Sequence, residues 1–520
     1  MNKVEVVIVG SGATGSLLAA KLAAAGKSVL ILEGGPERKE RDLVSSQLYA
    51  RRLKWGGPGD QTGGKNPVGI GFNSGWGTGG SATHHFGVWL RLHPEDFEMR
   101  SRFEAGLDWP IGYEELRPFY DRIQKEVGVS GDAEKEVWRP PGERYPMPAL
   151  PIFQHGMLID HGFKKREMRT APLPLAINSI EYNERAACIF DGWCDAGCPI
   201  NALGNPLAVY LPQAAKAGAR IIHNAFVSKV LTTDKGDRVS GVEYYDGRGR
   251  KVIQQADLVI LSAFTIQNPR ILLHSSNAKH PQGLANSSGL VGKYLLTHPS
   301  GSVYGIFKED TQNWLGVNGG QLLSQENYAK NRAKNYGRSS QWLIAQALKP
   351  NDLLGIANSR PDLFGNDLHK FIQKASKYLG TMTFVGETLP AKENQITLSA
   401  TRDRFGVPVA KLTFGFAAEE LKLFEAGMKE GKEIFQSAAT EEVWAGGGPN
   451  GMHILGGTIM GKIPQHSVTN SYGQTHDLPN LFVAGPGLFP TSGAVNPTFT
   501  IHALALRSAE YIQQNWSSII

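Results

Sequence analysis

Residues 4–15 read Val-Glu-Val-Val-Ile-Val-Gly-Ser-Gly-Ala-Thr-Gly, and an Ala- and Leu-rich stretch continues from there to Ala25. A continuous run of β-branched residues is typical of a strand buried on both faces, and the stretch after the glycines is typical of a helix. The glycine turn therefore lies at a helix N-terminus, where backbone N–H groups and the helix dipole hold an anion. Gly10 can make the tight turn, Gly12 lets the backbone approach a pyrophosphate, and Gly15 lets helix and strand pack closely.

A second predicted strand, Ser28 to Leu32, follows this helix and ends in Glu33. Its carboxylate lies about 20 residues beyond the glycines, where a dinucleotide-binding fold places an acid on the adenosine ribose. The alternative is an ordinary βαβ unit without a ligand. The order of strand, glycine turn, helix, strand and acid favours a bound dinucleotide, and it predicts an α/β fold with a Rossmann-like domain.

The composition is that of an ordinary globular protein of 520 residues, 41% of them hydrophobic. Its length suggests roughly two to four domains. The net charge of +6 is mild and dispersed, and no basic block or base-stacking motif occurs, so no nucleic-acid partner is expected. No apolar stretch of about 18 residues occurs, so no transmembrane segment is expected. The first predicted strand follows Lys3 directly and leaves no room for a secretory signal, so we expect a cytoplasmic protein.

Long segments rich in Gly and Pro interrupt the chain, and the first runs from Trp55 to Gly80. Such irregular segments usually wrap a ligand or cap a domain. Residues 75–85 read Gly-Trp-Gly-Thr-Gly-Gly-Ser-Ala-Thr-His-His and offer several backbone N–H donors for a phosphate or a flavin ring. A surface turn is the alternative for this stretch.

The middle of the chain carries further element signals. Pro and acidic residues predict an amphipathic helix that opens within residues 108–120. The patterns also predict a helix over 207–217 and strands over 221–230, 239–245, 251–255 and 257–262, the last one returning to the nucleotide sheet. From about residue 299 to 445 strands alternate with polar loops and no phosphate motif occurs, which predicts a substrate domain whose sheet roofs the cofactor.

Several motifs spread from residue 4 to residue 501 carry a family resemblance. Besides the N-terminal fingerprint, they are Gly79-Gly80-Ser81, Trp109-Pro-Ile, residues 266–273 (Ile-Gln-Asn-Pro-Arg-Ile-Leu-Leu), 450–461 (Asn-Gly-Met-His-Ile-Leu-Gly-Gly-Thr-Ile-Met-Gly), 479–486 and 491–501. Together they resemble the glucose-methanol-choline (GMC) flavoprotein oxidoreductases, and within that family the bacterial FAD-dependent sugar dehydrogenases that act on glucose, gluconate or fructose. The chain departs from those relatives at residues 80–84, where they more often carry Thr and Trp.

The resemblance implies the GMC fold, with FAD as the dinucleotide. It implies a discontinuous FAD-binding domain (1–149, 184–298 and 446–520) and a substrate-binding domain on an antiparallel sheet (150–183 and 299–445). The positions that match the family's FAD contacts are Gly10, Gly12, Ala13, Thr14, Gly15, Glu33, Gly79, Gly80, Ser81, His84, Val227, Gly485, Asn496, Pro497 and Thr498. Val227 is the candidate for the adenine edge, and a helix from Thr498 can point its N-terminus at the flavin.

Oxidation of an alcohol through FAD needs a base for the hydroxyl proton, and histidine has a suitable pKa. Of the 14 histidines, His453 lies in a glycine-rich loop and matches the family's active-site histidine. Asn496 matches the family's second position, filled by His or Asn, and its amide can orient the hydroxyl without titrating. A turn residue before Pro497 is the alternative for Asn496. His502 is expected to be a packing residue.

All three cysteines, Cys188, Cys194 and Cys198, fall within eleven residues. An odd number cannot all pair as disulfides, which makes a local metal site one hypothesis. Their spacing resembles the loop that holds a three-iron, four-sulfur cluster (3Fe-4S) in the sugar dehydrogenases. The other hypothesis is that the thiols are small packing residues, since buried cysteine often serves as a hydrophobe.

Two functions follow from the resemblance. The first is an FAD-dependent dehydrogenase of a sugar, glycoside or polyol that passes electrons to a cytochrome or quinone. It would work with a small chaperone-like subunit and a cytochrome c acceptor, and export in complex with a signal-bearing subunit to the periplasmic membrane face is then the alternative to a cytoplasmic location. The second is an oxidase of the same fold that passes electrons to dioxygen and acts on a sugar, glycoside or aromatic alcohol.

Overall fold

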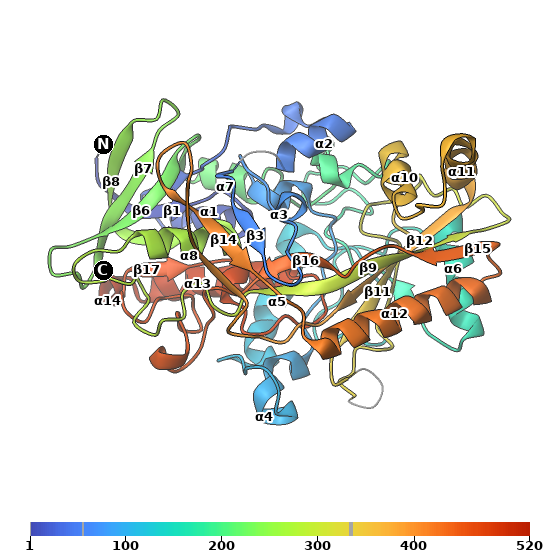
Figure 1. The fold of residues 1–520 in the computed structure, drawn as a ribbon. Helices are drawn as coiled ribbons and strands as arrows, with labels where there is room; N and C mark the ends of the chain where they lie inside the picture. Colours follow the sequence, from blue (N-terminus) through green and yellow to red (C-terminus); the bar gives the residue numbers. More distant parts are fainter. Residues whose placement is uncertain (1, 55–56, 332–335) are drawn as a thin grey trace.

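The computed structural model describes residues 2–54, 57–331 and 336–520, and it builds them around two large sheets. One sheet lies at the end of the molecule that holds both termini, and the other lies at the opposite end (Figure 1). A small third sheet of β13 (Gln395–Arg402), β14 (Pro408–Thr413) and β3 (Gln61–Gly63) joins distant parts of the chain. No helix in the described ranges is long and apolar enough to cross a membrane.

The first sheet has the order β5-β2-β1-β8-β7-β6, with β17 (Leu481–Val483) beside β8. At its centre, β1 (Val4–Val9) pairs in parallel with β2 (Val29–Leu32) and with β8 (Lys251–Leu261). Helix α1 (Ala13–Ala24) connects β1 to β2, so the predicted strand, turn, helix and strand are confirmed. β1 and β2 are buried along almost their whole length because sheet neighbours and helices cover both faces.

Two details of this sheet differ from the sequence-based prediction. The single strand predicted over 221–230 is two strands, β5 (Arg220–Ile222) and β6 (Phe226–Thr232), because the chain turns between them at Asn224, which has a φ of 51°. Conversely, the two strands predicted over 251–262 are one, β8. Its first half pairs antiparallel with β7 (Val239–Tyr245) and its second half pairs parallel with β1.

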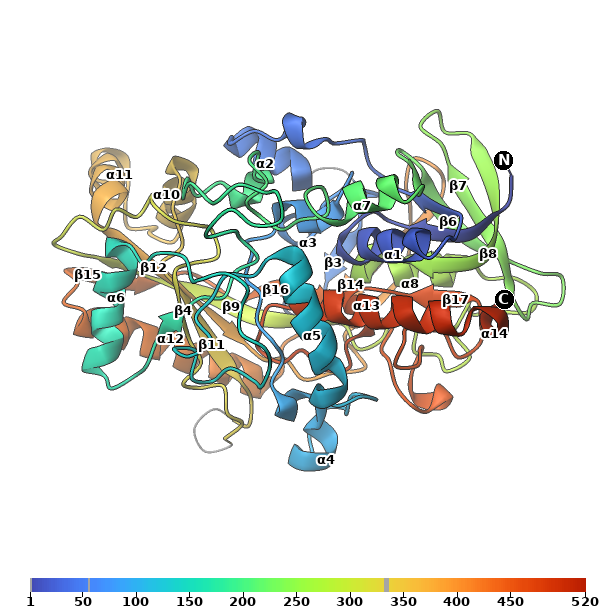
Figure 2. The same cartoon turned by 180° about the vertical axis from the view of Figure 1, so that it is seen from behind.

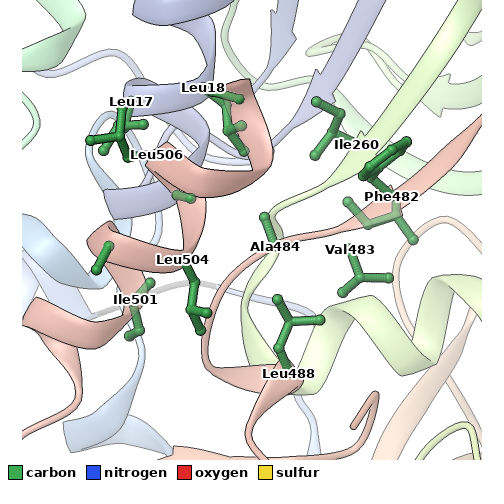
Figure 3. Packing of buried hydrophobic residues seen from close by; sticks show 14 of the residues in the cluster. Leu17, Leu18, Ile260, Phe482, Val483, Ala484, Leu488, Ile501, Leu504 and Leu506 are labelled. Atoms are coloured by element: carbon green, nitrogen blue, oxygen red, sulfur yellow. The ribbon is translucent and has the colours of Figure 1, made fainter. Parts of the chain in front are cut away.

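Helices α1, α5 (Tyr113–Val127), α7 (Tyr210–Lys216) and α13 (Thr498–Gln514) pack against one another over this sheet, as Figure 2 shows. The helix predicted within 108–120 is α5, and the one predicted over 207–217 is α7. Figure 3 shows part of the shared core, with Leu17 and Leu18 of α1, Leu504 and Leu506 of α13, and Ile260 of β8. Helices α1 and α13 are largely buried, so their packing fixes the position of the first residues of both helices beside the sheet.

The second sheet is antiparallel, with the order β15-β9-β12-β11-β10-β4 and with β16 (Asn450–Leu455) also paired to β9 (Leu296–Ile306). Its other strands are β4 (Ala171–Pro172), β10 (Leu322–Ser324), β11 (Ser340–Ile344), β12 (Leu379–Gly386) and β15 (Glu442–Ala445). Side chains alternate between its faces. Trp342 and Ile344 pack into a core with α12 (Ala418–Ser437), whereas Gln341 and Leu343 face the other way.

The remaining helices lie around these layers. They are α2 (Gln47–Lys54), α3 (Ile70–Asn73), α4 (Met99–Phe103), α6 (Gln154–Lys165), α8 (Phe264–His274), α10 (Pro350–Ala357), α11 (Gly365–Tyr378) and α14 (Trp516–Ile519). The segment predicted to be irregular from 55 to 80 contains only β3 and α3 as regular elements within its described part, and its residues 55–56 lie outside the described residues.

Candidate functional site

A cavity of about 510 Å³ lies between the first sheet and the roof formed by the second sheet. This volume is within the range of ligand sites, about 300 to 1,000 Å³. Most of the predicted cofactor positions line it. They are Gly10, Gly12, Ala13, Thr14, Glu33, Gly80, Ser81, His84, Val227, Gly485, Asn496, Pro497 and Thr498, together with His453. Gly15 and Gly79 lie behind this wall and pack against other parts of the chain.

The glycine turn has the shape that a pyrophosphate needs. A Cβ on Gly10 would collide with the carbonyl of Ser262, and one on Gly15 would collide with the carbonyl of Gly10. A Cβ on Gly12 would meet no atom closer than 3.8 Å, so this backbone faces open space. No side chain caps the N-terminus of α1, which leaves its first N–H groups for an anion.

The Glu33 carboxylate sits at the wall of the cavity, 5% exposed, and ties three loops together. Its Oε2 accepts hydrogen bonds from the backbone N–H and the hydroxyl of Ser11, at 3.0 and 2.7 Å. Its Oε1 accepts from the backbone N–H groups of Gly35 and Gly77, at 2.9 and 3.2 Å. The acid predicted to contact ribose therefore also holds the glycine turn against the loop before Gly80.

His84 presents an unusual atom to the same cavity. Its side chain is buried, and its Nε2 has no hydrogen-bond partner among the described residues. Burial, and then the charge of Lys54, lower the pKa of His84 to about 3, so the ring is neutral. A buried polar atom without a partner costs free energy, and a flavin bound here would offer it one. With the glycine turn, this orphaned nitrogen makes the residues present a fit for FAD.

Asn496, Pro497 and Thr498 enter the cavity where α13 begins. The first turn of α13 carries no acidic residue, so its positive dipole end is not neutralised by the chain. His502, one turn further on, is buried with its ring 4.8 Å from the ring of Trp89 and its Nδ1 bonded to the Thr498 carbonyl. His502 is thus a packing residue in this structure.

A β-bulge places the side chain of His453. Met452 is paired with His298 of β9, but the register shifts between Met452 and Leu455, and His453 has a φ of 62°. Bulges next to active sites re-aim a side chain, and a left-handed non-glycine residue is a strained one that its surroundings must hold. Burial, and then the neighbouring His298, hold the pKa of His453 well below its usual value.

Two side chains hold the His453 ring from opposite sides. The Nδ2 of Asn496 lies 3.2 Å from Nε2 of His453, and Nδ1 of His298 lies 2.9 Å from Nδ1 of His453. The two imidazole rings are nearly perpendicular, at 82°. The structure thus brings together the predicted pair of His453 and Asn496.

His298 is a residue that sequence reasoning did not identify as part of the site. It is fully buried on β9, and burial lowers its pKa to about 4. The sequence around it, Leu-Thr-His-Pro-Ser, is polar within an otherwise apolar strand, and this is the one signal that could have pointed to it. Its partner His453 lies 155 residues further along the chain.

The three cysteines do not support the cluster hypothesis. Within the described ranges, no group of three or more His, Cys, Asp or Glu side chains is arranged to hold a metal ion. Cys194 belongs to the main hydrophobic core, and the other two pack against it. Burial raises the pKa of the Cys188 thiol to about 11 and that of Cys194 well above its usual value, as expected of thiols that pack in a hydrophobic core. These observations favour the packing alternative.

The chain is similar to known proteins along almost its whole length. Two models described as GMC oxidoreductase match residues 4–300 and residues 390–505. The chain is 29% identical to the fructose dehydrogenase large subunit of Gluconobacter japonicus, over 98% of this chain and 97% of that protein. It is 31% identical to 2-methyl-1,2-propanediol dehydrogenase of Mycolicibacterium austroafricanum, over 100% and 97%. A formate oxidase variant from Aspergillus oryzae RIB40 shares the fold, with a TM-score of 0.70, 15% identity, and coverage of 100% of this chain and 99% of that one.

Proposed function

The chain belongs to the GMC oxidoreductase family, and on that premise we propose that it is an FAD-dependent dehydrogenase that oxidises an alcohol group of a sugar, glycoside or polyol to the carbonyl. FAD is the cofactor of this family. Two relatives similar over nearly their whole length are a fructose dehydrogenase subunit and a diol dehydrogenase. Both act on substrates with several hydroxyl groups, which supports this substrate class.

One observation carries the proposed chemistry: the Nε2 of His453 and the Nδ2 of Asn496 lie 3.2 Å apart at the cavity wall. A single hydroxyl oxygen can contact both groups at this separation. The substrate hydroxyl then replaces the contact between Asn496 and His453: Asn496 donates to its oxygen and orients it, while His453 accepts its proton at Nε2. FAD bound along the glycine turn, Glu33, His84 and the start of α13 supplies the acceptor for the hydride.

The roof of the cavity supports a polar substrate. Gln346 lines the cavity, and its Oε1 is buried with no hydrogen-bond partner in the part of the chain that the structure describes. Thr383 of β12 and Asn318 also line the cavity. A buried acceptor without a partner is satisfied by a ligand that brings a donor. A second hydroxyl of a sugar or polyol is such a donor.

For the electron acceptor we propose a cytochrome or quinone, reached with a companion subunit, because a relative is named as the large subunit of a dehydrogenase. The alternative is an oxidase that uses dioxygen. The described residues hold no group of metal ligands at the cysteines, so no iron–sulfur relay supports the first acceptor over dioxygen. Iron analysis of protein isolated without air decides between a cluster, with about three irons per chain, and none.

Anaerobic mixing of the purified yellow protein with sugars and polyols tests the proposal. We expect loss of the flavin absorbance with at least one of them, followed by fast reoxidation by an artificial one-electron acceptor and slow reoxidation by air. Fast reoxidation by air would favour the oxidase. A colourless protein that reduces NAD on addition of an alcohol would refute the proposed function.

A further inference from the structure

The protonation of the active-site histidine can be worked out from a backbone contact on the far side of His298. The Nε2 of His298 faces the carbonyl oxygens of Gly493 and Ser492, at 3.0 and 3.3 Å. Carbonyl oxygens only accept hydrogen bonds, so this nitrogen carries a hydrogen. His298 is neutral near pH 7 because burial lowers its pKa to about 4. Its other nitrogen, Nδ1, therefore presents a lone pair.

That lone pair fixes the tautomer of His453. The two Nδ1 atoms are 2.9 Å apart, and two lone pairs at this distance would repel each other. The Nδ1 of His453 must therefore carry the hydrogen and donate it to His298. Since His453 is also neutral, its Nε2 has the lone pair, and this is the nitrogen that faces Asn496. The nitrogen directed at the substrate position is thus the basic one.

The same donor-to-acceptor direction continues through a chain of hydrogen bonds between amide side chains. Because Nε2 of His453 accepts, the Asn496 amide turns its NH2 group towards it and its oxygen towards Nε2 of Gln341, at 3.3 Å. The oxygen of Gln341 accepts from Gln325 at 3.0 Å, and the oxygen of Gln325 faces Nε2 of His93 at 3.2 Å. Every contact joins a donor to an acceptor, from the Gly493 carbonyl to His93.

We propose that His298 is a positioning residue that imposes the Nδ1-protonated tautomer on His453 and stabilises the imidazolium formed when His453 accepts the substrate proton at Nε2. This role rests on the proposed function, since it serves the base of that reaction. His298 itself neither touches the substrate position nor takes up the proton. The charged group that acts on His298 is Asp96, and the group that acts on His453 is His298.

Two variants of His298 separate this role from simple packing. His298→Asn places an oxygen near the position of Nδ1 and keeps an acceptor for His453. His298→Leu fills a similar volume and has no acceptor. We expect His298→Leu to slow flavin reduction by substrate at least about 10-fold. The effect should be smaller than the decrease of about 100- to 10,000-fold that loss of the base itself would cause. His298→Asn should stay within about 3-fold of the wild type, since the acceptor is kept.

The pH profile gives a second readout. A wrong tautomer is not corrected by raising the pH, so the reduction rate of His298→Leu should stay low up to pH 9. Recovery to the wild-type rate at high pH would mean that only a pKa had moved, and it would overturn the proposal. Equal losses in His298→Asn and His298→Leu, with both variants folded and carrying flavin, would also overturn it.

Nitrogen NMR of the holoenzyme, with ¹⁵N in the histidine rings, reads the tautomer without any turnover. His453→Gln identifies the signals. We expect a protonated Nδ1 and an unprotonated Nε2 for His453 in the wild type and in His298→Asn, and a changed pattern in His298→Leu. An Nε2-protonated His453 in the wild type would refute the proposal even if His298→Leu does not fold. If no alcohol reduces the flavin, the proposed function fails, whereas this spectrum still decides the tautomer.

Discussion

Replacement of Glu33 by Gln should decrease the stability of the protein even in the absence of FAD. The change keeps the shape of the side chain but turns one carboxylate oxygen into an NH2 group. Glu33 accepts four hydrogen bonds, two on each oxygen, and all four come from the chain itself. An NH2 group in place of Oε1 would face two backbone N–H donors. In place of Oε2 it would face the backbone N–H of Ser11 and the Ser11 hydroxyl, which can turn to accept, so at least one hydrogen bond is lost.

The size of the effect follows from that count. A hydrogen bond to a charged group contributes about 1.5–3 kcal/mol, so the loss of at least one predicts a decrease of about 1.5–3 kcal/mol or more in the free energy of unfolding, reduced by whatever the loops can relax. FAD retention should fall as well, because the same carboxylate holds the glycine turn in place. If Glu33 contacted only the ribose, Glu33→Gln would weaken FAD binding but would not change the stability of the flavin-free protein.

Thermal unfolding of the flavin-free protein and flavin content after dialysis measure the two effects separately. Glu37→Gln is the matched control, because Glu37 lies four residues away, has a side chain that is 56% exposed, and forms a surface ion pair with Lys39. Such pairs contribute at most about 1 kcal/mol. If flavin-free Glu33→Gln unfolds at the same temperature as Glu37→Gln, the reasoning from the four hydrogen bonds is refuted.

Three further predictions concern the site and the buried histidines. His453→Ala should keep its flavin, but substrate should reduce that flavin at least about 100-fold more slowly, which is the contribution of a positioned base. Asn496→Ala should slow flavin reduction less. Stopped-flow flavin bleaching near the wild-type rate in His453→Ala would contradict the role of this residue. Gln346→Leu should raise the KM for substrates with a second hydroxyl and leave that for a simple alcohol unchanged, so equal effects on both in steady-state kinetics would count against the contact. Burial lowers the pKa of six histidines to about 3 or 4. His274 is half-buried, and the five others lie deep in the protein, namely His84, His85, His155, His298 and His502. Below about pH 6.5 the unfolded chain binds protons on these side chains and the folded chain does not. The free energy of unfolding therefore decreases as the pH falls, by up to about 1.4 kcal/mol per pH unit for each side chain. Denaturant titrations that show no decrease between pH 6.5 and 4.5 would contradict this prediction. Glu136 offsets part of this loss of stability, because burial raises the pKa of its carboxyl group to about 7.

The first βαβ unit could be predicted from the sequence because each of its signals is local. Strand, glycine turn and helix are encoded by adjacent residues, and the structure places them at Val4–Val9 and Ala13–Ala24. The two errors in strand number arose where local pattern and tertiary pairing disagree. A run of apolar residues does not reveal a left-handed residue such as Asn224, and polar residues around Gln255 do not show that β8 continues from one neighbour to another.

The proposed catalytic pair could be found from motifs, whereas the histidine that supports it could not. His453 stands in a recognisable glycine-rich loop, whereas His298 is recognised only through β9–β16 pairing, which joins residues 155 positions apart. The role of Glu33 in holding loops was missed for the same reason. Its partner Gly77 lies 44 residues away, in a segment without regular structure.

The carbonyl that orients His298 must itself be held still, and a buried ion cluster does this. The backbone N–H of Ala494, next to Gly493, donates to the hydroxyl of Tyr328 at 3.2 Å, and Tyr328 donates to Asp96 at 2.8 Å. Lys330, fully buried, bonds to both Asp96 and Glu387, at 2.8 and 3.0 Å. Burying three charges gains little net stability, because desolvation offsets the attraction between them. Their directional contacts do fix the position of the backbone beside Gly493, and through the two histidines that position determines which nitrogen of His453 carries the hydrogen.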